Sequence, residues 1–279
     1  VSRRDLLLQC DYVTCSTAEL AREVRALGRT AYVLPNTIGR ADLEEFGASR
    51  PLRQVSKPAR VRIAYFSGTR THAHDFACCA DALVRVLRDN RNTELLIVGE
   101  LDLPASFNGL RDRIITKPLM SHGDMLRELA DVDINLAPLE LGNPFTACKS
   151  ELKIFEAAIF AVPSVASPTP TFAAIIQHGE TGMLASTEEE WYSAIERLTN
   201  NALRRRIGDA AKAQIVPRFD IATAVEEAMT IDEAIINKRS VSLAAPAVSA
   251  AQRTATQPLM TVVAILYNKR SEERFFLEA

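Results

Sequence analysis

The sequence lacks the features that mark several common classes of protein. Only 6% of its 279 residues are aromatic and its formal net charge is −2, so it offers neither stacking platforms nor a basic field to nucleic acid. No apolar run approaches the length of about 18 residues that a membrane span needs, and the first residues do not resemble a secretory signal. We therefore expect a chain that binds no nucleic acid and contains no membrane span.

The cysteines and glycines exclude further classes. The chain has five cysteines, an odd number, without the spacings typical of metal or redox sites. Such cysteines are typical of free thiols in a reducing compartment. The dinucleotide fingerprint GxGxxG is absent as well, which argues against an enzyme that uses NAD. We expect a cytoplasmic protein, and peripheral association with the inner face of the membrane stays open.

Short apolar runs alternate with helical patterns through the middle of the chain. The strand-like runs are residues 61–66, 95–98, 114–116, 134–137, 164–166 and 183–185. The helical patterns include residues 75–88, 125–130, 152–160, 188–198 and 202–213. Such alternation forms βαβ units, whose right-handed crossovers place helices on both faces of one parallel sheet. The sequence therefore predicts an α/β, doubly wound, Rossmann-like domain.

The flanking segments differ in composition from this domain, which we place at residues 61–238. Residues 1–37 follow the order helix, strand, helix, strand, and the charged residues 38–60 resemble a connection. Residues 239–258 are rich in Ala, Ser, Thr, Gln and Pro, which predicts a flexible linker. Residues 259–279 begin with another strand-like run, the start of a further domain. Because both ends interrupt a pattern, we expect a piece of a longer protein.

Ligands of open parallel sheets bind beyond the carboxyl ends of the strands, so the loops there are candidate sites. The loop after the strand at 61–66 combines a turn-forming glycine, hydroxyls and a guanidinium ahead of a helix N-terminus, which favours anions. Its phosphate-binding candidates are Ser67, Gly68, Thr69 and Arg70. The alternative is a polar turn that only caps the helix. His72 and His74 lack a third ligand, so we expect hydrogen-bonding or exposed histidines and no metal.

A second candidate segment holds Lys149, Lys153 and Glu156, which fall on one face of a helix that includes all three. Two ammonium groups near a helix N-terminus could neutralise a diphosphate. One turn further on, a carboxylate could accept hydrogen bonds from ribose hydroxyls. The alternative is an ion pair between Lys153 and Glu156 on a solvated face, which would contribute only about a few tenths of a kcal/mol. The spacing fits both, and the buried-looking strands on either side favour the ligand.

Two further strand exits are less informative. Residues 117–120, which begin with Lys117, could pack against a nucleobase, although an ordinary loop fits them better. Residues 167–171 are rich in proline and hydroxyls, and a rigid turn of this kind needs no ligand. We keep Lys117 as a candidate ligand contact.

Several segments, taken in order, resemble the donor-binding C-terminal domain of retaining glycosyltransferases with two Rossmann-like domains, the GT-B fold. The segments are Pro35-Asn36 and residues 65–75, 97–99, 149–158, 161–167 and 178–184, with Trp191. The similarity runs from about residue 10 to residue 213 and is most specific at Lys149-Ser150-x-x-Lys153-x-x-Glu156. It points to the group 1, family 4-like members of bacterial polysaccharide biosynthesis, and hence to the cell envelope.

This resemblance implies roles for individual residues. In the family, the glutamate that matches Glu156 binds the ribose of the donor. Basic residues that match Lys149 and Lys153 hold the diphosphate and stabilise it as it leaves. The resemblance extends donor binding to Ser67, Gly68, Thr69 and Arg70 of the first loop. We add Lys117 and Ser150 as donor-binding candidates and His72 as a further catalytic candidate. Many relatives carry a second glutamate where this chain has Cys148, so the identity of the transferred sugar stays open.

The resemblance also implies a reaction and its partners. Members transfer a sugar from a nucleoside-diphosphate sugar to a glycan or lipid-linked acceptor, with retained anomeric configuration and generally without a metal or other cofactor. Residues 1–37 would be the remnant of an acceptor domain, and residues 259–279 resemble the opening of a second, inverting glycosyltransferase. We expect the fragment to bind a donor and to turn over poorly. The alternative, which Cys148 favours, is a non-catalytic nucleotide-binding or scaffold module of the same fold.

Overall fold

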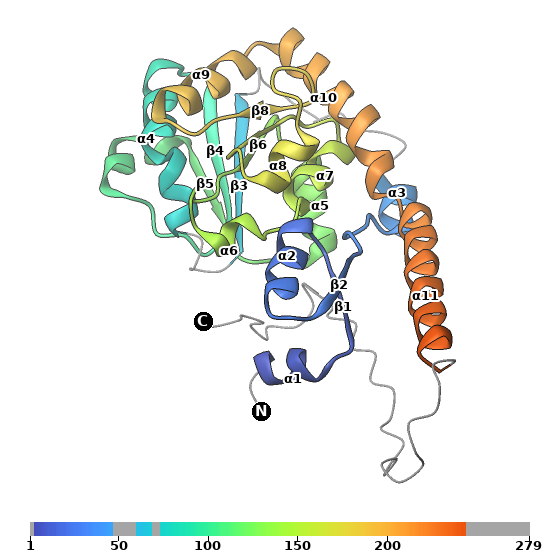
Figure 1. Ribbon diagram of the computed structural model, residues 1–279. Coiled ribbons are helices and arrows are strands. Elements are labelled where there is room, and N and C mark those ends of the chain that lie inside the picture. The colour runs from blue at the N-terminus through green and yellow to red at the C-terminus, as the bar shows by residue number, and fades with distance from the viewer. Residues whose placement is uncertain (1–2, 47–59, 69–72, 244–279) are drawn as a thin grey trace. The chain divides into compact units, whose positions relative to one another are not determined.

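The computed structural model describes residues 3–46, 60–68 and 73–243, and it divides the chain into two compact units (Figure 1). One unit comprises residues 36–220, and the other comprises residues 1–35 together with residues 221–279. Among the described residues, no helix has both the length and the apolar character that crossing a bilayer requires.

The larger unit is built on a parallel sheet of six strands, with the order β5-β4-β3-β6-β7-β8. The strands are β3 (Val61–Gly68), β4 (Thr93–Gly99), β5 (Ile114–Lys117), β6 (Ile134–Ala137), β7 (Ser164–Ala166) and β8 (Met183–Leu184). Every neighbouring pair is parallel. The predicted α/β, doubly wound, Rossmann-like fold is therefore confirmed.

Helices cover both faces of this sheet (Figure 1). One face packs against α4 (Ala73–Asp89), the 3-10 helix η2 (Ala105–Arg113) and α9 (Glu188–Leu198). The other face packs against α3 (Arg40–Phe46), α5 (His122–Ala130), α7 (Leu152–Ile159) and α8 (Pro170–Ile175). Side chains alternate along the strands, so Ile63 and Tyr65 pack in the hydrophobic cluster on the first face. Ala64 packs in the cluster on the second face. The helix α10 (Asn201–Ile215) contributes Ile207 to the first cluster and Ala211 to the second.

The strand order reverses between β3 and β6. After β3, the chain adds β4 and β5 on one side and then returns to place β6 on the other side of β3. The helix that follows β3, α4, and the helix that follows β6, α7, pack on opposite faces of the sheet, and ligands of open parallel sheets bind beyond the carboxyl ends of the strands at such a junction. Register fixes this junction, because Ile63 pairs with Ile134 and Ala64 with Asn135.

The segment before α7 differs from the prediction. The helix begins at Leu152, with Glu151 as its N-cap, so Lys149 lies in the preceding turn and does not share a helical face with Lys153. This turn is held from two sides. The backbone N–H of Lys149 donates to the carbonyl of Thr146 at 3.1 Å, and the carbonyl of Lys149 accepts from Thr171 Oγ1 at 3.0 Å. Both bonds stabilise the turn that links α7 to α6 (Pro144–Ala147).

Two predicted boundaries also differ. The expected connection at residues 38–60 contains α3, whose Phe46 packs edge-on against Phe160 with ring centroids 5.5 Å apart. The linker expected at residues 239–258 starts too early, because α11 (Ile221–Leu243) continues through its first residues. The rest of that linker and the further domain expected at residues 259–279 lie outside the described residues.

The N-terminal residues form a small parallel pair of strands in the other unit. The order is α1 (Arg3–Gln9), β1 (Tyr12–Cys15), α2 (Ala18–Ala26) and β2 (Thr30–Val33), which confirms the predicted order of elements. Thr17 caps α2 by accepting from the N–H of Leu20 at 3.1 Å. That these residues are the remnant of an acceptor domain stays a prediction.

Candidate functional site

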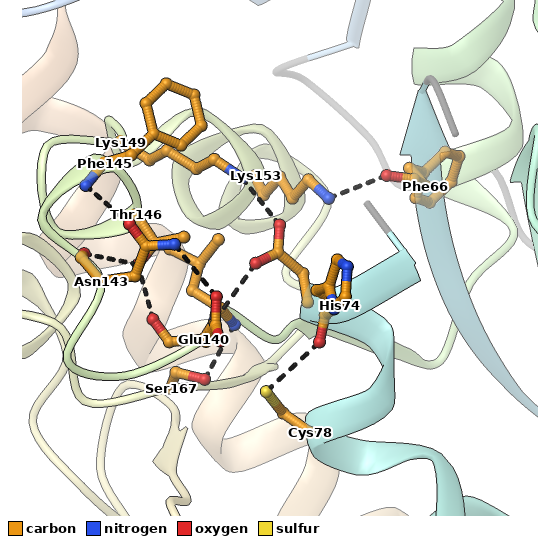
Figure 2. Close-up of polar contacts among 12 residues, drawn as sticks. Phe66, His74, Cys78, Glu140, Asn143, Phe145, Thr146, Lys149, Lys153 and Ser167 are labelled. Carbon is orange, nitrogen blue, oxygen red and sulfur yellow. Dashed lines mark hydrogen bonds and ion pairs between the residues drawn. The ribbon is translucent and has the colours of Figure 1, made fainter. Parts of the chain in front are cut away.

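The candidate site lies where β3 and β6 end, at the switch point of the strand order. Three segments meet there: the end of β3, the first turn of α4, and the chain between β6 and α7 (Figure 2). Thr69, Arg70 and His72, which were predicted to bind phosphate or to act in catalysis, lie outside the described residues. Their roles stay predictions.

Lys149 is held by a buried carboxylate on α4. Its Nζ donates to Asp75 Oδ2 at 2.7 Å, and the side chain of Asp75 is only 4% exposed. The other oxygen of Asp75, Oδ1, accepts from the backbone N–H of Glu140 at 3.2 Å. Asp75 thus joins α4 to both ends of the β6–α7 segment.

Lys153 reaches the end of β3 from the first turn of α7. Its Nζ donates to the carbonyl of Phe66 at 2.8 Å (Figure 2). The same atom lies 4.6 Å from the centroid of the Tyr65 ring. An ammonium held in this way does not fit the alternative of a solvated helix face. The first turn of α7 therefore directs one cation at the end of β3, and the turn before α7 directs another at Asp75 in the first turn of α4.

Glu156 lies one turn further along α7 and is only 5% exposed. Its Oε1 is 2.9 Å from Nε2 of His122, the first residue of α5. Sequence reasoning missed His122, because the exit of the strand at 114–116 was considered only as far as Met120. A cue was available: Ser121 caps α5 by accepting from the N–H of Asp124 at 3.2 Å, so the residue after it begins a helix at a strand exit.

The first loop is tightly built at its described end. Ser67 is 1% exposed, and its hydroxyl donates to the carbonyl of Glu100 at 2.9 Å, which ties the end of β3 to the end of β4. Gly68 has a positive φ of 76°, a conformation that favours glycine. The Ser67 hydroxyl therefore stabilises the fold. Gly68 has no side chain, so it can contact a ligand only through its backbone.

Two other predicted contacts have partners elsewhere. Lys117 forms an ion pair with Glu128 of α5, at the end of the edge strand β5. Ser150 Oγ accepts from Asn36 Nδ2 at 2.9 Å, which ties the turn before α7 to the start of this unit. That either residue binds the donor stays a prediction.

The turn that carries Cys148 is partly apolar. Asn143 caps α6 by accepting from the N–H of Phe145 at 3.0 Å, and Cys148 closes that helix at intermediate exposure. The ring of Phe145 is 49% exposed, and its centroid lies 5.3 Å from Nζ of Lys149. The short helix α6 therefore carries an exposed aromatic ring and ends at a thiol.

The pKa values of two side chains near Asp75 are raised. Burial first, and then Asp75, raise the pKa of Tyr65 and of Cys78. Among the described residues, Lys153 bonds to the end of β3, Lys149 pairs with Asp75 in the first turn of α4, and Glu156 lies one turn further along α7. This arrangement can bind an anion such as a diphosphate next to a group that carries hydroxyls.

Glu151, the N-cap of α7, makes the stability of the fold depend on pH. Its Oε2 is buried and has no hydrogen-bond partner among the residues that the structure describes. Burial raises the pKa of Glu151 from 4.5 to about 7, and the opposing effects of its own backbone N–H and of Arg218 are smaller. The folded state therefore binds this proton more tightly than the unfolded state does.

Glu151→Gln is expected to stabilise the protein at pH 8 and to change little at pH 5. Because the pKa in the fold lies above the unfolded value, the contribution of Glu151 to stability falls as the pH rises from about 4.5 to about 7. The Glu151→Gln substitution would remove this loss of stability, because an amide side chain does not titrate in this pH range. Urea denaturation of both proteins at the two pH values measures it, and an equal effect at both would contradict it.

Comparison with known proteins identifies the fold and the family. Residues 60–201, a little over half of the chain, match the family Glycosyl transferases group 1. A search of curated protein sequences finds no match. Among solved structures, HepE of Anabaena in complex with UDP and glucose is similar over 81% of this chain and 63% of its own, with a TM-score of 0.61 and 17% identity.

Two further structures share the fold. A mutant of S. aureus TarM, in complex with Fondaparinux, alpha-GlcNAc-glycerol and UDP, is similar over 79% of this chain and 43% of its own, with a TM-score of 0.60 and 14% identity. Sucrose-phosphate synthase from Thermosynechococcus elongatus is similar over 84% of this chain and 61% of its own, with a TM-score of 0.60 and 16% identity. The chain spans less than two thirds of each of the three structures. The sheet order, the cations at its switch point and the family match agree: this chain belongs to the group 1 glycosyl transferases.

Proposed function

We propose that this chain carries the donor site of a retaining glycosyltransferase, which moves a sugar, a hexose in our interpretation, from a nucleoside diphosphate to a glycan or lipid-linked acceptor. The observation that carries the proposal is that Lys153 is held at the end of β3 and Lys149 by Asp75 in the first turn of α4, with Glu156 one turn further along α7. The two cations suit a diphosphate, and the carboxylate suits the hydroxyls of a ribose.

In this proposal, the protein supplies charge that is already in place. As the bond between the anomeric carbon and the diphosphate oxygen breaks, the acceptor hydroxyl forms the new bond on the same face and loses its proton. Negative charge then grows on the leaving oxygen. Lys149 and Lys153 stabilise this charge, and since Asp75 and the carbonyl of Phe66 already hold them, little reorganisation is needed. The reaction needs no metal in this scheme.

The physiological setting belongs to the same proposal. Group 1 family membership and relatives crystallised with UDP support a nucleotide-sugar donor. We infer a role in the synthesis of a polysaccharide of the cell envelope, in the cytoplasm and at the inner face of the membrane. We further infer that the fragment alone turns over slowly, because the chain spans less than two thirds of the structures it resembles.

The test is calorimetric titration of the 279-residue chain with UDP, GDP, dTDP and NAD. We expect one diphosphate to bind and NAD not to bind. Glu156→Ala should weaken that binding by about 1.5–3 kcal/mol, the range for hydrogen bonds to a charged group. Glu196→Ala, at an exposed position on α9, is the matched control and should bind like the wild type. No binding by any of the diphosphates would contradict the proposal.

A second arm separates the diphosphate from the nucleoside. Lys153→Ala should raise the dissociation constant of pyrophosphate and leave that of the nucleoside unchanged, because the ammonium of Lys153 is held at the end of β3. Equal losses for both ligands would instead indicate a folding defect. The alternative, a non-catalytic binding module, rests on Cys148, and it predicts binding of the diphosphate without transfer by the full-length enzyme.

A further inference from the structure

His122 and Glu156 form a contact that the proposed reaction does not explain. Residue 122 begins α5 and residue 156 lies on α7, and Nε2 of the histidine is 2.9 Å from Oε1 of the glutamate. With Glu156 ionised, its oxygens can only accept, so Nε2 carries the proton and donates. The side chain of Glu156 is 7% exposed and that of His122 is 35% exposed.

The contact is not required to build either helix. Ser121 caps α5 through its side chain, and the apolar residues Leu126 and Leu129 anchor that helix in the core. Neighbouring residues on α7, such as Phe155 and Ala158, are likewise buried in that core. A carboxylate that is almost buried is costly, however, unless it is hydrogen-bonded. The hydrogen bond from His122 therefore offsets the free-energy cost of burying the Glu156 carboxylate. It also fixes Oε1, one of the two carboxylate oxygens.

We propose that His122 is a positioning residue for the ribose of the donor, and this inference rests on the proposed function. By holding Oε1, it fixes the plane of the Glu156 carboxylate, and thereby the directions from which that group accepts further hydrogen bonds. A ribose hydroxyl must approach along one of these directions. His122 thus acts through Glu156 and sets how strongly the site distinguishes ribose from 2′-deoxyribose.

The experiment compares UDP, 2′-deoxy-UDP and pyrophosphate on the full chain by calorimetry. If guanine binds more tightly than uracil, GDP and 2′-deoxy-GDP replace the first two ligands. The wild type should prefer the ribonucleotide by about tenfold, the value of one hydrogen bond to a charged group. In His122→Ala, UDP should bind about tenfold more weakly and this preference should fall towards one, while pyrophosphate binding stays unchanged.

Two further variants separate positioning from loosening of α5. His122→Gln keeps an N–H donor at a similar reach and should restore most of the preference for ribose. Asp124→Ala changes an exposed residue in the same turn, which bonds to Ser121 and Arg127, and it should keep the wild-type preference. A merely structural role would leave the ratio between the two nucleotides unchanged in every variant.

The outcomes distinguish the two proposals. If UDP binding is lost in Glu156→Ala while His122→Ala keeps the wild-type preference for ribose, the inference is wrong and the proposed function stands. If His122→Gln behaves like His122→Ala, the donated hydrogen bond is not the cause and the inference is also wrong. If the wild type binds none of UDP, GDP and dTDP, the proposed function is wrong and the inference falls with it.

Discussion

Gly208→Ala is expected to destabilise the protein by about 3 kcal/mol or more, the upper part of the range for overpacking. A Cβ at Gly208 would stand 1.9 Å from the carbonyl oxygen of Ala161 and 2.8 Å from its carbonyl carbon. Both are backbone atoms of the short connection from α7 to β7. Ala161 has a φ of 53°, and hydrogen bonds from Val162 to Ala157 (3.1 Å) and from Asn135 to Pro163 (3.0 Å) hold the chain next to it.

The sign of this effect opposes the intrinsic preference of a helix. In the middle of a helix, alanine is favoured over glycine by about 1 kcal/mol, so an open site in α10 would gain stability. Urea denaturation measures the difference. Gly109→Ala is the matched control, because a Cβ there would meet no heavy atom within 4 Å. Equal stability of the two variants would mean that the connection moves aside without cost.

Gly99→Ala is expected to destabilise the protein by about 2–3 kcal/mol and to weaken binding of the donor. Gly99 ends β4 with a φ of 101°, where an L-residue pays roughly 1–2 kcal/mol. Its Cβ would also stand 2.8 Å from both the backbone N and the backbone O of Gly68. These atoms belong to the turn that leads out of β3 into the predicted diphosphate loop, so the strain falls on the site.

Gly179→Ala is the control for this prediction, because it has the unfavourable backbone conformation but no steric clash. Gly179 has a φ of 80°, and a Cβ there would meet nothing within 4 Å, so Gly179→Ala pays only the conformational cost. We expect that variant to lose about 1 kcal/mol and to bind UDP like the wild type. Gly99→Ala should lose more stability, and its UDP dissociation constant should rise. If the two variants have the same affinity for UDP, the turn at Gly68 does not contribute to donor binding.

Local patterns in the sequence were sufficient for the fold class. Apolar runs such as 61–66 and 95–98 became β3 and β4, and the strand at 164–166 was predicted at the bounds that the structure has. These patterns report burial, which each residue acquires largely from its own segment. The same reasoning found Lys149, Lys153 and Glu156. It misplaced Lys149 on the helix, because side-chain spacing does not reveal the tertiary bond from Thr171 that holds the preceding turn.

The sequence by itself therefore determined a parallel sheet with helices on both faces, and three residues of its candidate site. Only the tertiary structure decided that β6 lies beside β3, which puts the reversal of strand order between them. It also decided that Asp75 holds Lys149 and that His122 holds Glu156, pairs separated by 74 and 34 positions in the chain. Periodicity repeats within one element and carries no information about which elements become neighbours. Strand order and helix packing fix those neighbours, and with them the partners of each charge.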